Sequence, residues 1–249
     1  MKRLLCSLVL ALVVISFSTP TFATTDAIAP AENKEAQEKA PKSSLNQGKW
    51  EVLSNADGFT TKRKSVEGSN IFAFRGETVA DVPIAKLLTI FLDSESRSKW
   101  VNMYGGDATL ENKTKSDRVY WIRFNTPFPT SDRDYVLHAK GHADHDNRVY
   151  TTTIESVDHP TKPKNGCCVR GVAYGTYYRF EAIPGTNKTR VEVEVHTDPK
   201  GWLPSWLTNV IQKNWPKKTL TSLIREASKP TVQAHPEFAA WDQAFGAIQ

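Results

Sequence analysis

The chain has 249 residues, of which 32 are Lys or Arg and 27 are Asp or Glu, and these charges are interspersed along its length. A nucleic-acid-binding protein usually carries a concentrated basic stripe, so the net charge of +5 argues against nucleic acid as a partner. Cys167 and Cys168 are adjacent, and neighbours close only a strained ring. We therefore expect packed or free thiols, with a redox-active pair as the alternative, in a fold stabilised by its apolar core.

The N-terminal segment predicts export. A basic start at 1–3, an apolar run over 4–17 and small residues at 21–23 are typical of a signal peptide covering 1–23. The apolar run is shorter than the roughly 20 residues that a membrane-spanning helix needs. Residues 24–48 are rich in Ala, Pro, Glu and Lys, which indicates a disordered linker. We therefore expect a periplasmic or secreted protein with one domain.

That domain should cover 49–229, followed by a C-terminal tail at 230–249. Its first part predicts a hairpin of strands 58–66 and 71–79. The apolar period then changes, and 83–92 reads as a helix that begins at a proline, with Asp81 as its N-cap. A second short helix is predicted over 94–101.

Strands dominate the middle of the chain. Val191, Val193 and Val195 alternate with charged residues, which predicts one apolar face and one solvated face for that strand. Turn-forming residues separate the segments. The predicted strands are 117–125, 133–143, 148–157, 167–183 and 188–196.

The longest predicted helix begins near Trp202 and ends near Ala227, with a wide apolar stripe and a kink expected at Pro216. The tail that follows should be weakly helical at best, with Phe238, Trp241 and Phe245 packing back on the domain. These elements predict an α+β fold in which a curved antiparallel sheet wraps around a long C-terminal helix. Periodicity leaves open whether a core or a cavity lies between them.

Four stretches resemble the START domain family, the lipid-transfer domains related to the steroidogenic acute regulatory protein. They are Leu92-Asp93 through Trp100, Tyr120-Trp121 through Val136, Val169-Arg170-Gly171 with Pro184, and Asp198-Pro199-Lys200-Gly201-Trp202-Leu203-Pro204. The resemblance implies a helix-grip fold with a hydrophobic tunnel for one lipid-like molecule. Sterol-type members pair an acidic residue thirteen positions before the arginine of the Arg-Asp-aromatic-Val motif with an arginine six positions after it. Tyr120 and Ala139 stand at those positions, so sterol binding of that type is not implied.

Within the resemblance, strand alternation predicts which side chains face the tunnel. An inward Ala139 places Arg133 on the same face, where it needs an anionic partner on the ligand or on the protein. For the other predicted tunnel residues, the alternative is ordinary packing in the core or between helix and sheet. The predicted ligand-binding residues are Tyr120, Ile122, Phe124, Arg133, Tyr135, Leu137, Leu203, Leu207, Val210 and Ile211.

The sequence lacks signatures of common enzyme chemistry. His138, His142 and His145 beside Asp144 and Asp146 read as a solvated hairpin rather than a metal site. Phosphate-cradling glycine loops, dinucleotide fingerprints and serine-hydrolase elbows are absent from it. We expect no cofactor, no metal and no enzymatic activity. The alternative is a helix-grip enzyme of the cyclase or hydrolase type, with His196 or Tyr135 as acid or base.

The residues and the resemblance together predict an exported, monomeric carrier for a lipid or other hydrophobic molecule. Movement of the last helix and of the 158–166 loop would gate a tunnel of several hundred Å³. Lysines of this loop, Lys162 and Lys164, and the flank of Lys213, Trp215, Lys217 and Lys218 are candidates for transient membrane contact; simple solvation is their alternative.

Overall fold

The computed structural model describes residues 49–162, 164, 168–203 and 205–243. The predicted signal peptide and linker, together with Cys167 and Phe245, lie outside these residues. All described residues belong to one compact unit, Lys39–Gln249. No helix among them is both long and apolar enough to span a membrane.

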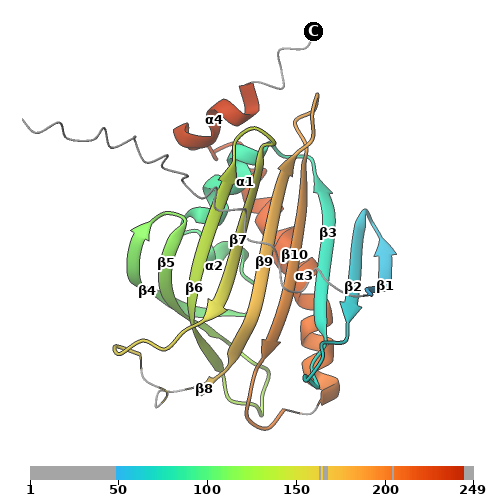
Figure 1. Ribbon diagram of the computed structural model, residues 1–249, viewed down its shortest axis with the longest axis vertical. Coiled ribbons are helices and arrows are strands. Elements are labelled where there is room, and N and C mark those ends of the chain that lie inside the picture. The colour runs from blue at the N-terminus through green and yellow to red at the C-terminus, as the bar shows by residue number, and fades with distance from the viewer. Residues whose placement is uncertain (1–48, 163, 165–167, 204, 244–249) are drawn as a thin grey trace, which may run out of the picture. The chain divides into compact units, whose positions relative to one another are not determined.

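The described unit is a curved, mostly antiparallel sheet that wraps around the helix α3, as the sequence predicted (Figure 1). The strand order is β1-β2-β3-β10-β9-β7-β6-β5-β4, and β8 pairs in parallel with β6. The strands are β1 Glu51–Ala56, β2 Phe59–Lys64, β3 Ala73–Ala80, β4 Tyr104–Thr114, β5 Asp117–Phe124, β6 Arg133–Asp144, β7 Val149–Ser156, β8 Val169–Arg170, β9 Val172–Ala182 and β10 Thr189–Asp198. The helices are α1 Ile84–Leu92, α2 Arg97–Trp100, α3 Ser205–Ala227 and α4 Pro236–Gln243.

Two strands were missing from the sequence prediction. Both β1 and β4 lie at the edges of the sheet, and all of their residues are exposed or only half-buried, so neither has a buried apolar face that its sequence could show. The register of β4 against β5 also shifts three times, which disrupts the period of two. The predicted strand 167–183 is divided at Gly171, where an added Cβ would lie 2.4 Å from the ring of Tyr135.

The helices differ from the prediction in their ends. The N-cap of α1 is Pro83 and no side chain caps this helix, so the Asp81 prediction is wrong. The shorter α2 starts only at Arg97 because residues 94–96 form a turn that Asp93 holds through its carboxylate. Pro216 lies inside α3, where an added Cβ on Gly76 of β3 would approach it to 2.7 Å.

The C-terminal tail contains a helix, contrary to the weak helicity predicted. Phe238 and Trp241 of α4 are buried, and the Phe238 ring packs edge-on against Tyr150. Trp241 donates its indole N–H to His145 Nδ1 at 2.9 Å. Tertiary packing therefore stabilises a helix that its own propensity would leave marginal.

Cys168 is disulfide-bonded, which corrects the prediction of free, packed thiols. That prediction rested on the strain that a ring between adjacent cysteines carries. The two other cysteines, Cys6 and Cys167, lie outside the described residues.

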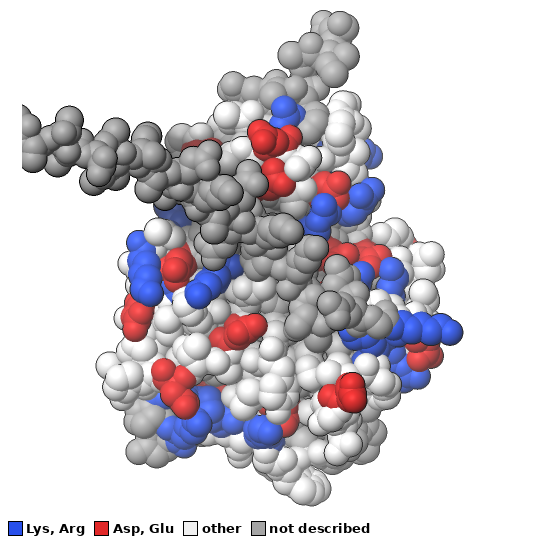
Figure 2. Space-filling view, in the orientation of Figure 1, with Lys and Arg blue, Asp and Glu red and all other residues white. Residues whose placement is uncertain are grey.

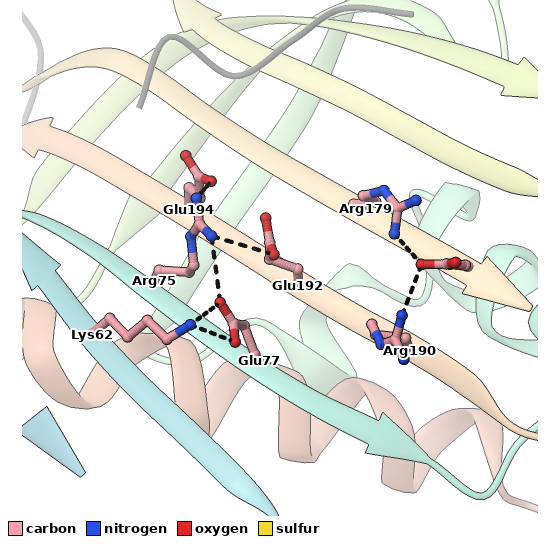
Figure 3. A network of polar contacts seen from close by, with 8 residues as sticks. Lys62, Arg75, Glu77, Arg179, Arg190, Glu192 and Glu194 are labelled. Atoms are coloured by element: carbon pink, nitrogen blue, oxygen red, sulfur yellow. Dashed lines mark hydrogen bonds and ion pairs between the residues drawn. The ribbon is translucent and has the colours of Figure 1, made fainter. Parts of the chain in front are cut away.

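The outer face of the sheet is polar, as predicted. Part of it is buried, however, whereas the sequence predicted a solvated face. On the side shown in Figure 2, basic and acidic side chains are intermixed. Glu194 is fully buried and forms an ion pair with Arg75, whose guanidinium also lies 3.6 Å from Glu192 and 3.4 Å from Glu77 (Figure 3). The ring of Trp50 covers Arg75 at 4.5 Å. A buried carboxylate is tolerated here because a guanidinium neutralises it.

This network makes the stability of the domain depend on pH through Glu192. Burial raises the pKa of Glu192 to about 7; Arg75 opposes this shift, and Glu194 and Glu77 add to it. The folded pKa exceeds the unfolded value, so the contribution to stability is complete below pH 4.5 and is lost as the pH rises through about 7. We expect Glu192→Gln to raise the free energy of unfolding by about 1–3 kcal/mol at pH 8.5 and to have little effect at pH 5.

Urea unfolding at pH 5, 7 and 8.5 measures this effect, with Glu181→Gln as the matched control. The pKa of Glu181 is lowered: burial raises it, but hydrogen bonds and charges of Arg179 and Arg190 outweigh burial. Glu181→Gln should therefore lower stability at pH 8.5. A Glu192→Gln profile parallel to wild type at all three pH values would contradict the prediction.

Candidate ligand-binding cavity

A cavity of about 170 Å³ lies between the concave face of the sheet and α3. Its walls come from the ends of α1 and α2, from the inner faces of β5, β6, β7, β9 and β10, and from the first half of α3. Aromatic and aliphatic side chains form most of this lining, together with a few polar groups.

The inward side chains of β5 and β6 are those that alternation predicted. Antiparallel pairing sets Tyr120 opposite Leu137, Ile122 opposite Tyr135 and Phe124 opposite Arg133. All six side chains line the cavity, as do Leu203 and Ile211. Leu207 is half-buried on α3 but is not among the lining residues, and the Val210 side chain lies outside the described part of the structure.

Sequence reasoning missed several lining residues. Arg118 lies two positions before Tyr120 on the same face of β5, so the same alternation would have found it. The residues of α2 and β9 reach the cavity only through tertiary packing, and local pattern carries no signal for them. The missed residues include Phe91, Arg97, Trp100, Arg118, Tyr178, Thr208, Gln212 and Trp215.

The cavity is smaller than the several hundred Å³ expected, because large aromatic side chains such as Tyr120, Tyr135 and Tyr178 occupy the inner face. Its volume is close to that of an engineered cavity of about 150 Å³ that holds benzene. A void of this size costs about 4 kcal/mol at roughly 24 cal/mol per Å³. A guest that fills it should therefore stabilise the domain, and a lipid with two acyl chains requires the cavity to widen.

One end of the cavity is organised by Arg133, which is 2% exposed. Its guanidinium donates to the carbonyls of Ser131, Pro199 (3.3 Å) and Lys200 (3.2 Å). The predicted protein carboxylate is not found: within the described residues, Arg133 forms no ion pair with Asp or Glu. Burial lowers the pKa of Arg133. The side chain thus ties the β5–β6 loop to the β10–α3 loop.

The other end of the cavity is organised by Arg118 and Arg97. Nη1 of Arg118 donates to the Leu92 carbonyl at 2.8 Å and to Ser94 Oγ at 2.9 Å, at the C-terminal end of α1. Arg97 forms an ion pair with Asp107, and its guanidinium carbon lies 4.2 Å from the centre of the Tyr120 ring. Arg118 and Phe124, the partner of Arg133, are six residues apart on β5, so the two ends are separated by about 20 Å.

Of the two residues considered as acid or base in the enzyme alternative, only Tyr135 lines the cavity. His196 lies on the outer face of β10, where its Nε2 is 3.1 Å from Ser69 Oγ, and it is not among the lining residues. Tyr135 does line the cavity, but burial raises its pKa far above neutrality. A group that stays protonated is poorly suited to acid–base catalysis near pH 7.

The histidines of the 138–145 region contact different partners. His138 contacts Asp117 at 2.7 Å, whereas His145 accepts the hydrogen bond from Trp241. Within the described ranges, no group of three or more His, Cys, Asp or Glu side chains is arranged to hold a metal ion.

Several known proteins are similar to this chain in sequence or in fold. The family model of the START domain matches residues 31–220. The mouse phosphatidylcholine transfer protein is 27% identical over 195 residues, which cover 77% of this chain and 90% of that protein. An uncharacterized protein of Pseudomonas aeruginosa is 26% identical over 180 residues, covering 72% of this chain and 87% of the other. The solved structure of human StAR-related lipid transfer protein 5 superimposes with a TM-score of 0.66 at 18% identity, covering 72% of this chain and 86% of that one.

The curved sheet, the helix α3 and the cavity between them define a helix-grip domain with an internal, largely apolar cavity. The chain belongs to the START domain family.

Proposed function

We propose that this protein binds a lipid or other hydrophobic molecule in the cavity between the sheet and α3 and carries it between membranes outside the cytoplasm. The observation that supports the proposal is the cavity itself, whose largely apolar walls enclose a void of about 170 Å³. A bilayer and an apolar cavity both remove CH₂ groups from water, each worth about 0.8 kcal/mol, so exchange between them is nearly balanced. The similarity to the mouse phosphatidylcholine transfer protein supports the same function.

Loading should take place at the Arg133 end. Thr126, Pro199 and Leu203 line the cavity there, and they belong to the two loops that Arg133 joins. Loops move more readily than the central strands. We propose that these loops, the 158–166 loop and the first half of α3 separate to widen the cavity for a lipid.

Membrane contact is proposed at the same end. Phe128 is 96% exposed in the β5–β6 loop and Trp202 is 78% exposed just before α3. Aromatic side chains of this kind partition into the membrane interface. Two of the predicted contact residues form surface ion pairs: Lys164 with Asp158 at 3.2 Å within the 158–166 loop, and Lys217 with Asp57 at 3.2 Å.

The double variant Phe128→Ser/Trp202→Ser should lower the rate of lipid transfer between vesicles at least tenfold, because that loss corresponds to about 1.4 kcal/mol of membrane contact. Binding of the same lipid from detergent should be unchanged, since neither side chain lines the cavity. Val79→Ser is the control, because Val79 is 50% exposed on β3 away from these loops. Equal transfer rates for all three proteins would reject this contact surface.

Native mass spectrometry of the protein purified from its own host, followed by organic extraction, tests the carrier function. A bound hydrophobic molecule that is lost on extraction is the expected result. Reloading with it should raise the melting temperature, because the ligand fills a void that costs about 4 kcal/mol. A protein that purifies without a guest and exchanges no lipid with vesicles would reject the function.

Export and a monomeric state are part of the proposal. The N-terminal basic and apolar segments support export. The mass of the mature N-terminus in the periplasmic or culture fraction tests cleavage near residue 23, and light scattering tests the monomer.

A further inference from the structure

We infer that the Arg118 end of the cavity binds an anionic group of the ligand, a carboxylate or a phosphate, while its apolar part extends toward the Arg133 end. This inference rests on the proposed carrier function and names the class of lipid carried. It distinguishes fatty acids and anionic phospholipids from uncharged and zwitterionic lipids.

The first support is the charge of the cavity wall. Its described lining residues include no Asp or Glu and four basic side chains, of which Arg97, Arg118 and Arg133 are buried and Lys115 is exposed. A carboxylate, that of Asp107, neutralises Arg97 from outside the lining. Buried cations without counter-charges are costly, so an anion that enters this cavity relieves an existing imbalance.

The second support is the unused hydrogen-bonding capacity of Arg118. A guanidinium carries five N–H donors on three nitrogens, and only Nη1 of Arg118 bonds to a described residue. Arg118 is 9% exposed and lines the cavity. Burial lowers its pKa, and the nearby Arg97 lowers it further. An anion beside it would receive charge-assisted hydrogen bonds, which are among the strongest in proteins.

The third support is an unpartnered donor from a second element. Nε1 of Trp100 in α2 is buried and has no hydrogen-bond partner among the described residues, and the Trp100 side chain lines the cavity. A buried N–H without an acceptor costs about 1–3 kcal/mol. Hydrogen-bond donors therefore outnumber acceptors at this end of the cavity, and an oxygen atom of the ligand would supply the missing acceptor.

Arg133 is a weaker candidate for the same role. Each of its three guanidinium nitrogens already donates to a backbone carbonyl. Its hydrogen bonds hold two loops together, whereas those of Arg118 leave two nitrogens for a ligand. A quaternary ammonium group would meet the Arg118 guanidinium, which forms no ion pair with a described carboxylate, and this charge disfavours zwitterionic head groups.

The experiment compares four lipids with matched oleoyl chains: oleic acid, phosphatidic acid, phosphatidylcholine and diacylglycerol. We expect the delipidated wild type to bind oleic acid or phosphatidic acid at least tenfold more tightly than diacylglycerol and phosphatidylcholine. The stronger of the two anionic lipids identifies a carboxylate or a phosphate as the bound group. Arg118→Gln keeps an amide donor for the Leu92 carbonyl and removes the charge, so it should lose this preference while diacylglycerol affinity changes less than threefold.

Arg123→Gln is the matched control, because Arg123 lies on the same strand but donates to the Gly105 carbonyl and does not line the cavity. It should keep the wild-type preference. Trp100→Phe keeps the ring and removes the N–H, so a severalfold weaker preference is expected even if Arg118→Gln fails to fold. Wild type that binds all four lipids equally, or an unchanged preference in both variants, overturns the anionic site and leaves the carrier function intact. Binding of none of the four rejects both.

Discussion

Replacing Ala139 with phenylalanine should lower lipid uptake at least tenfold and leave the domain folded. Ala139 is 8% exposed, lines the cavity and lies opposite Arg118 in the β5–β6 pairing. An aromatic ring at this position fills space that the ligand needs. Because the empty cavity costs about 4 kcal/mol, the added ring should also maintain or raise the free energy of unfolding.

Uptake of a fluorescent fatty acid or phospholipid, together with thermal unfolding, measures both effects. Lys140→Phe is the matched control, because Lys140 is the next residue on β6 and faces outward. It should bind lipid as the wild type does. Normal uptake by Ala139→Phe with a raised melting temperature would show that this cavity is not where the lipid binds.

Arg170→Leu should destabilise the domain by about 3–5 kcal/mol at pH 7, the cost typical of leaving a buried charge without its partner. Asp134 receives two hydrogen bonds from Arg170, at 2.9 and 2.8 Å, and one from Trp121 Nε1 at 2.7 Å. The side chains of Asp134 and Arg170 are 7% and 10% exposed. This pair also joins β8 to β6 on the outer side of the sheet, next to the 158–166 loop.

The effect should depend on pH. Burial would raise the pKa of Asp134, but the hydrogen bonds from Arg170 and Trp121 hold it below its usual value. A depressed folded pKa contributes stability above pH 3.8 that is lost as the pH falls through the folded pKa. The difference between wild type and Arg170→Leu should therefore shrink toward pH 3.

Urea unfolding at pH 7 and pH 3 checks this result. Arg190→Leu is the control, because Arg190 is 57% exposed in its pair with Glu181 and should cost less than about 1 kcal/mol. The double variant Arg170→Leu/Asp134→Leu should recover part of the loss, since no buried charge remains. Equal costs for Arg170→Leu and Arg190→Leu would show that the Asp134 pair contributes no more than a surface pair.

The small volume of the cavity has a consequence for the proposed carrier function. The empty cavity costs about 4 kcal/mol, which is less than the typical stability of a domain, about 5–15 kcal/mol. In the proposed function, the protein therefore remains folded after it releases its ligand, and binding of the next ligand provides the free energy that opens the cavity.

The sequence by itself determined the elements with a strong period and the faces they bury. Tyr120, Ile122 and Phe124 line the cavity because side chains alternate along a strand, and this rule holds whatever the neighbouring strand is. The long apolar stripe ending near Ala227 likewise predicted α3 without any tertiary information.

Tertiary structure alone decided the features that depend on neighbours distant in the chain. The edge strands β1 and β4 are held by pairing rather than by a buried face, and α4 is held by contacts with Tyr150 and His145. Glu194 looks solvated in its strand, yet Arg75 and the packing around it bury it completely. The volume of the cavity and the free donors at Arg118 and Trp100 also belong to this group, because they depend on how closely several elements approach and on which hydrogen-bond partners each side chain finds there.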